Sequence, residues 1–286
     1  MAQKTKVNGE DILYHFFKDL LESDADLAQF LIAKAIASLS IWFHPITYQH
    51  MPIISPFIVR DSSCRGKNGD SDEWGSPNDK GFFRDDNSIV KGFPKSLGIS
   101  GIGQAKYHAK RLGNGFVASH VWRKTNKFNS NEDLASRNPF LNTFIPNIVW
   151  LPKQLSKLTD REGSFAQKYL QNLSAIIYKN ILIRKPLSEM TTKCWQQLSL
   201  PKIDESMLPK IEDISFFNHD DKMISRRKNI IYEVIYALDN CINGKPISKK
   251  VVSSRYTEQL PSVNQKHLIK LKHDLTQYIE MLDEAS

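Results

Sequence analysis

Two polar residues, His120 and Asn147, lie at the edges of short apolar segments and carry side chains suited to hydrolysing a phosphate ester. An unperturbed imidazole has a pKa of about 6.5, so His120 would accept a proton from water near neutral pH. An asparagine carbonyl oxygen is a ligand that Mg²⁺ accepts, with water completing the shell. Together the two residues predict metal-assisted hydrolysis, with Asn147 acting both in catalysis and as a metal ligand.

Basic residues surround these two candidates and indicate a polyanionic partner. The chain has 286 residues and a formal net charge of +8, with a sequence pI near 9.2. A basic balance of this kind favours nucleic acid over an acidic or neutral partner. The residues predicted to contact phosphates near the candidate site are Arg123, Lys124, Lys127, Lys153 and Lys157.

The local pattern around the candidates predicts a strand, a long loop, a second strand and a helix. Residues 115–123 alternate as in a strand that contains His120, and residues 124–137 are polar and basic. Residues 146–152 form a second strand-like run that ends at Pro152. A helix is expected from Lys153, directly after a position where proline is tolerated.

Over residues 113–182 this order resembles the HNH, or ββα-metal, nuclease superfamily. The matching residues are His120 on the first strand and the segment Asn147-Ile-Val-Trp-Leu-Pro on the second. The resemblance implies that His120 is the general base and that the products are a 5′-phosphate and a 3′-hydroxyl. Ser119 occupies the position where many relatives carry an acidic metal ligand, and the resemblance makes it a second metal-ligand candidate.

The third signature position of that superfamily lies on the helix, and this chain offers Gln154, Ser156 or Asp160 for it, with Gln154 taken as the catalytic candidate. Many relatives also carry zinc-binding cysteine pairs. The three cysteines here are widely separated and form no CxxC pair, so no structural zinc is expected.

Residues 61–92 have the composition of a long loop that faces a ligand. Glycine, Asp, Asn and Ser are frequent there, and aromatic residues and arginines lie among them. Within this segment, Arg65 and Arg84 are predicted to contact DNA bases. Two other histidines, His44 and His108, are alternative bases for which a structural role is expected.

The predicted fold class is α+β, mainly helical, with a ββα-metal nuclease core. Residues 1–112 form an N-terminal helical region with the long polar loop, residues 113–182 the catalytic core, and residues 183–286 a C-terminal helical region. Two helices are expected in the first forty residues, with the apolar stripe of the second (Leu27, Phe30, Leu31, Ala35, Ile36 and Leu39) packed in the core. The apolar seam of residues 268–282 is expected to pack within the chain.

The sequence excludes a membrane protein, because no apolar run approaches the roughly 18 residues that a spanning helix needs. The first residues lack the features of a signal peptide, so a cytoplasmic location is expected. The function predicted is a stand-alone type II restriction endonuclease that cleaves double-stranded DNA with Mg²⁺, for which Mn²⁺ can substitute, and that can act as a homodimer. The alternatives are a low-specificity anti-phage or toxin DNase, and a DNA-binding protein without catalytic activity.

Overall fold

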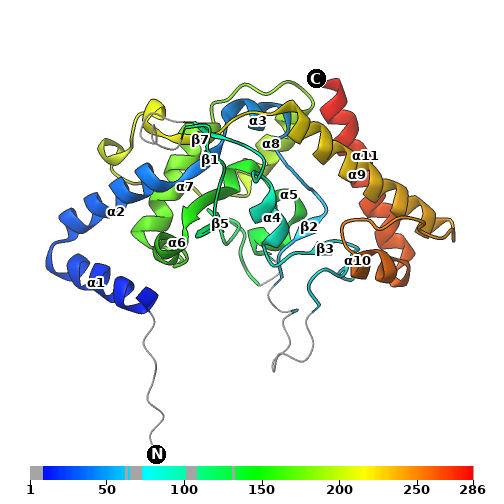
Figure 1. Cartoon of the computed structure of the whole chain (residues 1–286), viewed down its shortest axis with the longest axis horizontal. Helices are drawn as coiled ribbons and strands as arrows, with labels where there is room; N and C mark the ends of the chain where they lie inside the picture. Colours follow the sequence, from blue (N-terminus) through cyan, green and yellow to red (C-terminus); the bar gives the residue numbers. More distant parts are fainter. Residues whose placement is uncertain (1–8, 62–63, 65–72, 101–107, 131–132, 286) are drawn as a thin grey trace, which may run out of the picture.

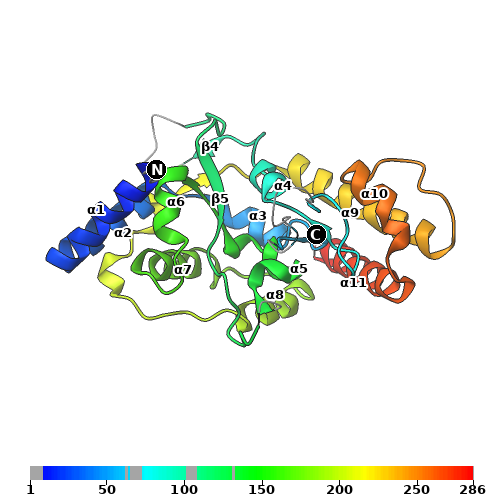
Figure 2. The ribbon, with the colours of Figure 1, turned by 90° about the horizontal axis from the view of Figure 1, so that it is seen from below.

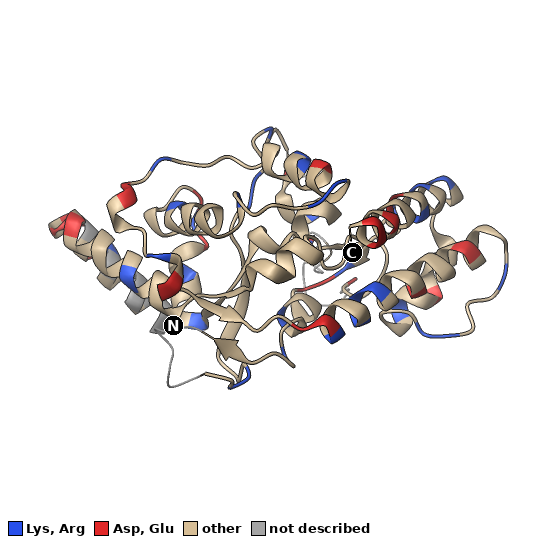
Figure 3. Ribbon diagram, turned by 90° about the horizontal axis from the view of Figure 1, so that it is seen from above, with Lys and Arg blue, Asp and Glu red and all other residues tan. Residues whose placement is uncertain are grey.

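The computed structural model describes residues 9–61, 64, 73–100, 108–130 and 133–285. It has a mixed α+β fold with about 53% helix and a small mixed sheet (Figure 1). The predicted class, α+β and mainly helical, is confirmed at that level. Basic and acidic residues are spread over helices and loops along the whole molecule (Figure 3).

The central sheet has five strands in the order β4-β7-β1-β6-β5. Their bounds are β4 Ile99–Ser100, β7 Ser215–Phe217, β1 Ile41–Phe43, β6 Ile148–Pro152 and β5 Phe116–His120. Strands β1 and β7 are parallel, and the other neighbours are antiparallel. A separate parallel pair joins β2 (Ile58–Val59) to β3 (Phe83–Arg84). The five-stranded sheet therefore draws strands from all three regions of the chain that the sequence distinguishes.

Helices surround this sheet and extend from it to both sides (Figures 1 and 2). Their bounds are α1 Gly9–Ser23, α2 Ala25–Leu39, α3 Pro45–His50, α4 Ser88–Gly92, α5 Pro139–Asn142, α6 Lys153–Thr159, α7 Phe165–Tyr178, α8 Leu187–Gln196, α9 Asp221–Ile242, α10 Ser254–Gln259 and α11 Gln265–Glu284. Short 3₁₀ turns connect several of them. No helix in the described part of the chain is both long enough and apolar enough to cross a membrane.

Aromatic side chains fill the core around the middle of the sheet. Phe43 of β1, Trp150 of β6 and Phe217 of β7 meet one another with ring centroids 5.1–5.7 Å apart. Every residue of β6 except Pro152 is buried, which is why that segment reads as a continuous apolar run. This buried strand holds the edge strand β5 in place along its full length.

The C-terminal helix α11 closes the core. Its predicted seam, Leu268, Leu271, Leu275, Tyr278 and Leu282, is buried against the rest of the chain, so the expected packing within one chain is confirmed. The Tyr278 hydroxyl accepts a hydrogen bond from the Ile53 amide (3.1 Å) and donates one to the Ile53 carbonyl (2.5 Å). A single side chain from α11 thus satisfies both backbone groups of a residue 225 positions earlier.

The two N-terminal helices occur as predicted, but the stripe assigned to the core on the second helix is wrong. Leu27, Phe30, Leu31 and Leu39 are exposed, and of the predicted stripe only Ile36 is fully buried. Helix α2 is apolar on more than one face, and it turns the face with Ala28, Ile32, Ala33 and Ile36 to the core. Asn8, the expected cap of the first helix, lies outside the described residues.

Candidate functional site

Strands β5 and β6 and helix α6 form the predicted strand, loop, strand and helix. The two strands pair antiparallel from Phe116 opposite Pro152 to His120 opposite Ile148, and α6 begins at Lys153 immediately after β6. Because α6 follows the strand without a loop, it packs across both strands of the pair. His120 therefore lies at the end of the edge strand, next to the helix.

A cavity of about 590 Å³ opens over this edge. Its walls come from β5, α6 and the start of α4, with Arg60 and Arg123 from neighbouring loops. Figure 2 shows α6, β5 and α4 following one another across the molecule. The lining residues are Arg60, Asp86, Asn87, Ser88, Lys91, Val117, Ala118, Ser119, His120, Arg123, Lys153, Ser156, Lys157 and Asp160. Five are Lys or Arg and two are Asp, so the cavity attracts an anion such as phosphate.

His120 is held in one orientation by a backbone group. Its Nε2 lies 3.0 Å from the carbonyl oxygen of Asn142. A carbonyl oxygen can only accept a hydrogen bond, so Nε2 carries the proton and Nδ1 is the basic nitrogen of the neutral ring. The geometry therefore presents a histidine with a fixed tautomer whose side chain lines the cavity.

The electrostatic surroundings keep this histidine neutral. Burial, and next the positive charge of Arg60, lower the pKa of His120 to about 4, although its hydrogen bond to Asn142 acts in the opposite direction. At neutral pH the imidazole is thus uncharged, with its one proton on Nε2 and a lone pair on Nδ1.

Asn147, predicted as a catalytic residue and metal ligand, is not among the residues that line the cavity. Its side chain is fully buried. The amide oxygen accepts a hydrogen bond from the Trp122 backbone amide (2.7 Å), and the amide nitrogen donates one to the Leu141 carbonyl (2.9 Å). Asn147 therefore joins the residues after β5 to the α5 segment and the start of β6. It acts as a positioning residue for the strand that carries His120.

We expect Asn147→Ala to lower the free energy of unfolding by about 2–4 kcal/mol, because two buried backbone groups would lose their partners. Urea denaturation followed by circular dichroism measures this change. Asn180→Ala, at an exposed asparagine, is the matched control and should leave stability within about 0.5 kcal/mol of wild type. A stable Asn147→Ala protein would contradict the positioning role.

Two of the three candidates for the third signature position line the cavity, namely Ser156 on α6 and Asp160, the residue that caps the C-terminus of α6. The Ser156 hydroxyl donates a 2.8 Å hydrogen bond to the Lys153 carbonyl. Gln154, predicted as the third catalytic residue, is exposed on α6 and is not among the lining residues. The difference follows from the helical period, which places residues four apart on one face and residue 154 on another.

Asp160 and Asp86 are the two carboxylates that line the cavity, and a carboxylate suits a hard cation better than a serine hydroxyl does. Partial burial raises the pKa of the Asp160 carboxyl, while Arg123, Lys157 and Arg60 act to lower it. Ser119, predicted as a metal ligand, lines the cavity but is largely buried. No group of three or more His, Cys, Asp and Glu side chains that could hold a metal occurs in the described part of the chain. The donor set still fits Mg²⁺, which is commonly held by one or two carboxylates plus substrate phosphates and water.

The predicted phosphate contacts divide between the cavity and a loop outside it. Arg123, Lys153 and Lys157 line the cavity, and an Arg123 guanidinium nitrogen donates to the backbone carbonyl of Asp160. Lys124 and Lys127 are exposed in the loop after β5 and do not line it. The Lys124 ammonium instead lies 4.5 Å from the centre of the Phe128 ring.

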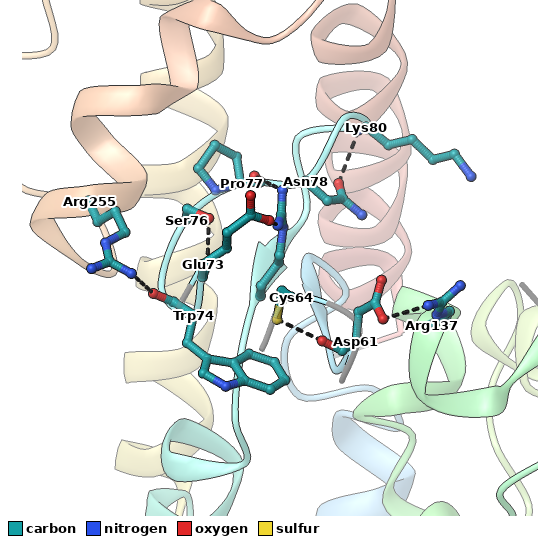
Figure 4. A network of polar contacts seen from close by, with 11 residues as sticks. Asp61, Cys64, Glu73, Trp74, Ser76, Pro77, Asn78, Lys80, Arg137 and Arg255 are labelled. Carbon is teal, nitrogen blue, oxygen red and sulfur yellow. Dashed lines mark hydrogen bonds and ion pairs between the residues drawn. The ribbon is translucent and has the colours of Figure 1, made fainter. Parts of the chain in front are cut away.

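Arg84 lies in a different cavity, of about 430 Å³, rather than beside His120. It pairs with Glu73 and donates a 2.9 Å hydrogen bond to the Pro77 carbonyl. Arg137 faces the same cavity and pairs with Asp61 at 2.5 Å (Figure 4). These ion pairs connect residues of the polar segment to one another and to Arg137. They give the Arg84 side chain a structural role that needs no contact with DNA bases. Arg65, predicted to act with it, lies outside the described residues.

The polar segment 61–92 is only partly the loop that its composition predicts. It contains β3 and α4, and the Asp85 carboxylate accepts hydrogen bonds from the amides of Ile89 and Val90 at the start of α4. Asn87 adopts a positive φ of 79° and donates a 3.1 Å hydrogen bond to the Ala118 carbonyl. This bond ties α4 to the edge strand and so places Lys91 on the cavity wall.

Sequence reasoning did not assign Arg60 and Lys91 to the site. Arg60 follows β2, and its backbone exchanges hydrogen bonds with Ser136: the Arg60 amide donates to the Ser136 carbonyl (2.8 Å), and the Ser136 hydroxyl donates to the Arg60 carbonyl (3.1 Å). These bonds, together with the bond from Asn142 to the Ile58 carbonyl, hold the residues around Arg60 near His120. A weak signal existed, since Arg60 ends an apolar strand-like run and begins the polar segment.

The other two histidines do not line the cavity. The Nδ1 of His44 accepts a 3.2 Å hydrogen bond from the Ile46 amide at the start of α3. Burial, and then the nearby His219, lower the pKa of His44. His108 is exposed and forms a bridge to Ile99. The expected structural roles agree with these positions.

Comparisons of the chain with models of protein families, with curated proteins and with solved structures found no match.

Proposed function

We propose that this protein is a metal-dependent endonuclease that hydrolyses phosphodiester bonds of double-stranded DNA. The observation that carries the proposal is the neutral His120, fixed by the Asn142 carbonyl in a cavity lined by five lysines and arginines. A positioned base beside an anion-binding cavity is what hydrolysis of a phosphate diester requires. The strand, strand and helix that carry it support the ββα-metal core inferred from the sequence.

In this proposal the Nδ1 of His120 takes a proton from the attacking water, while Nε2 remains bonded to Asn142. Arg60 faces His120 and Asp160, and its guanidinium would stabilise the charge that develops on the phosphate. Arg123, Lys153 and Lys157 would hold the flanking phosphates. The side-chain amide of Asn142 also donates a 3.0 Å hydrogen bond to the Ile58 carbonyl. This bond holds Asn142 in place, and with it the Asn142 backbone carbonyl that orients His120.

Asp160, with Ser119 or Ser156 near it on the wall, would hold the divalent cation. When bound, Mg²⁺ or Mn²⁺ would stabilise negative charge on the phosphate and on the leaving oxygen. The basic wall of the cavity would then place the scissile diester beside the histidine.

The first test is incubation of the purified protein with supercoiled plasmid in Mg²⁺ or Mn²⁺, with EDTA as the control. Metal-dependent conversion to nicked and linear DNA is expected. Intact plasmid in all metals would contradict catalysis and favour the DNA-binding alternative.

A stand-alone type II restriction endonuclease is the form of this activity that we propose, acting in the cytoplasm, in which a homodimer would cut both strands of a symmetric site. Discrete fragments from a plasmid digest would support it. A smear would instead favour a low-specificity anti-phage or toxin DNase.

The pH profile of cleavage should report the lowered pKa of His120. Because kcat/KM follows ionisations of the free enzyme, its acid limb should fall near pH 4–5, whereas a histidine of ordinary pKa would already be largely protonated at pH 5.5. Arg60→Gln removes a cation that lowers this pKa, so it should move the limb to higher pH by about one unit. The Asp160 carboxyl responds to Arg60 in the same direction.

Initial rates on a fluorescent duplex between about pH 3.5 and 8 measure this shift. Arg184→Gln changes the same charge at an exposed position outside the cavity and should leave the profile unchanged. An acid limb near pH 6.5 in the wild-type enzyme would contradict the lowered pKa.

A further inference from the structure

A row of basic residues leads from the catalytic cavity across α4 to α9. We call Lys91, Lys95, Arg226 and Arg227 the α4–α9 ridge. Lys91 belongs to the wall of the cavity, and Lys95 follows α4 by three residues. Arg227 of α9 lies against Phe93 at the end of α4, with its guanidinium carbon 4.6 Å from the ring centre. Lys91 and Arg227 therefore lie at the two sides of one short segment, residues 91–93, with Lys91 on the cavity wall.

The charges of this ridge are not balanced within the described part of the protein. None of its four cations forms an ion pair there with a carboxylate. Lys228, the next residue on α9, does pair with Asp283, at 2.9 Å. The four cations of the ridge thus differ from Lys228, whose charge is balanced by the Asp283 carboxylate.

Arg227 shows the imbalance most clearly. Its Nε is buried and has no hydrogen-bond partner among the described residues. Burial, and next the adjacent Arg226, lower the pKa of Arg227 to about 10. A partly buried cation beside a like charge is costly unless an anion from outside completes the arrangement. The ring of Phe93 offsets only part of that cost.

We infer that the α4–α9 ridge binds the phosphate backbone of the DNA duplex on one side of the scissile bond. This inference rests on the proposed function. A duplex whose scissile phosphate occupies the cavity must continue past its edge, and α4 leads from that edge to α9. Regularly spaced phosphates would supply anions to these four cations, none of which pairs with a carboxylate in the part of the chain that the structure describes, and such contacts position a duplex without reading its sequence.

The test is DNA affinity, measured separately from cleavage. A fluorescein-labelled duplex of about 25 base pairs is titrated with His120→Ala protein, which serves as the uncleaving background, at several salt concentrations. Adding Lys95→Gln and Arg226→Gln should weaken binding about tenfold at 0.1 M salt. It should also reduce the slope of log K against log salt by about 2, since each phosphate contact contributes roughly 0.9.

The matched control is Lys249→Gln with Lys250→Gln in the same background. These two exposed lysines follow α9 at its far end, and their loss changes the net charge equally. Equal effects of the two double variants would show only a general charge effect and would overturn the ridge. An unchanged slope in the Lys95 and Arg226 variant would overturn it too.

Arg227→Met separates binding from a structural role. If an external anion is the missing partner, this variant loses DNA affinity while the Tm of the DNA-free protein stays equal or rises. Unchanged DNA affinity with a lower Tm would overturn the assignment of Arg227.

The two proposals can fail separately. Plasmid cleavage by the wild type, with the Lys95 and Arg226 substitutions affecting neither affinity nor salt slope, overturns the ridge and leaves the nuclease standing. A wild-type protein that neither cuts plasmid nor binds the duplex overturns both.

Discussion

His120→Ala is expected to reduce plasmid cleavage by about 10³-fold or more while leaving DNA affinity close to that of the wild type. The large effect follows because a positioned general base contributes up to about 10⁴-fold, and no other histidine of the described residues lines the cavity. Affinity is retained because the lysines and arginines that would bind phosphate remain in place. Rates are measured as loss of supercoiled DNA, and affinity by fluorescence anisotropy.

His108→Ala is the matched control for this experiment, since His108 is an exposed histidine outside the cavity. It should cleave at the wild-type rate. Circular dichroism and a thermal melt should show that both variants are folded. Full activity in folded His120→Ala protein would end the assignment of His120 as the base.

Asp160→Asn should produce the second largest loss, about 10²-fold in kcat/KM at a fixed low Mg²⁺ concentration. The change keeps the shape of the side chain but removes the negative charge that would attract a divalent cation. Activity should recover in part as the metal concentration is raised, so the metal titration moves to higher concentration. Titrations with Mg²⁺ and Mn²⁺ measure both effects.

Asp86→Asn tests whether any carboxylate of the cavity would have the same effect. Asp86 also lines the cavity, but its carboxylate accepts a 2.9 Å hydrogen bond from the Ser88 amide at the start of α4. Its substitution should change the metal titration little. If the Asp86 variant shifted the titration and the Asp160 variant did not, the metal would have to be assigned to the α4 side of the cavity.

The strands and helix that carry His120 could be predicted from the sequence because their signals are local. Alternation over residues 115–123, the apolar run before Pro152 and the helical residues after it each fall within a few positions of one another. Pairing of β5 with β6 follows from their nearness in the chain. The placement of His120 beside α6 was thus accessible without knowledge of the rest of the fold.

The remainder of the cavity depends on contacts between distant segments. Arg60 reaches it through backbone bonds to Ser136, and Lys91 through the bond from Asn87 to the Ala118 carbonyl. No spacing rule connects such positions. The exposed apolar residues of α2 show a related limit, because a helix that is apolar on two faces does not reveal which face packs inward.

Asn147 shows why a residue type and its place in a motif do not fix the role of a side chain. An amide suits a metal site and a backbone crosslink equally well, since it offers one acceptor and two donors. Which role it takes depends on whether it faces the cavity or the amide of Trp122, and only the fold decides this.

The two hydrogen bonds between Tyr278 and Ile53 also determine when the protein can finish folding during its synthesis. Ile53 leaves the ribosome early, yet its amide and carbonyl obtain their partner only after about 225 further residues have been added. Strand β1 likewise cannot pair with β7 until residues 215–217 have been synthesised. A nascent chain that already contains residues 60–160 therefore still lacks the contacts that complete the fold around its cavity. In the proposed nuclease, this order of assembly delays cleavage until Tyr278 has been synthesised.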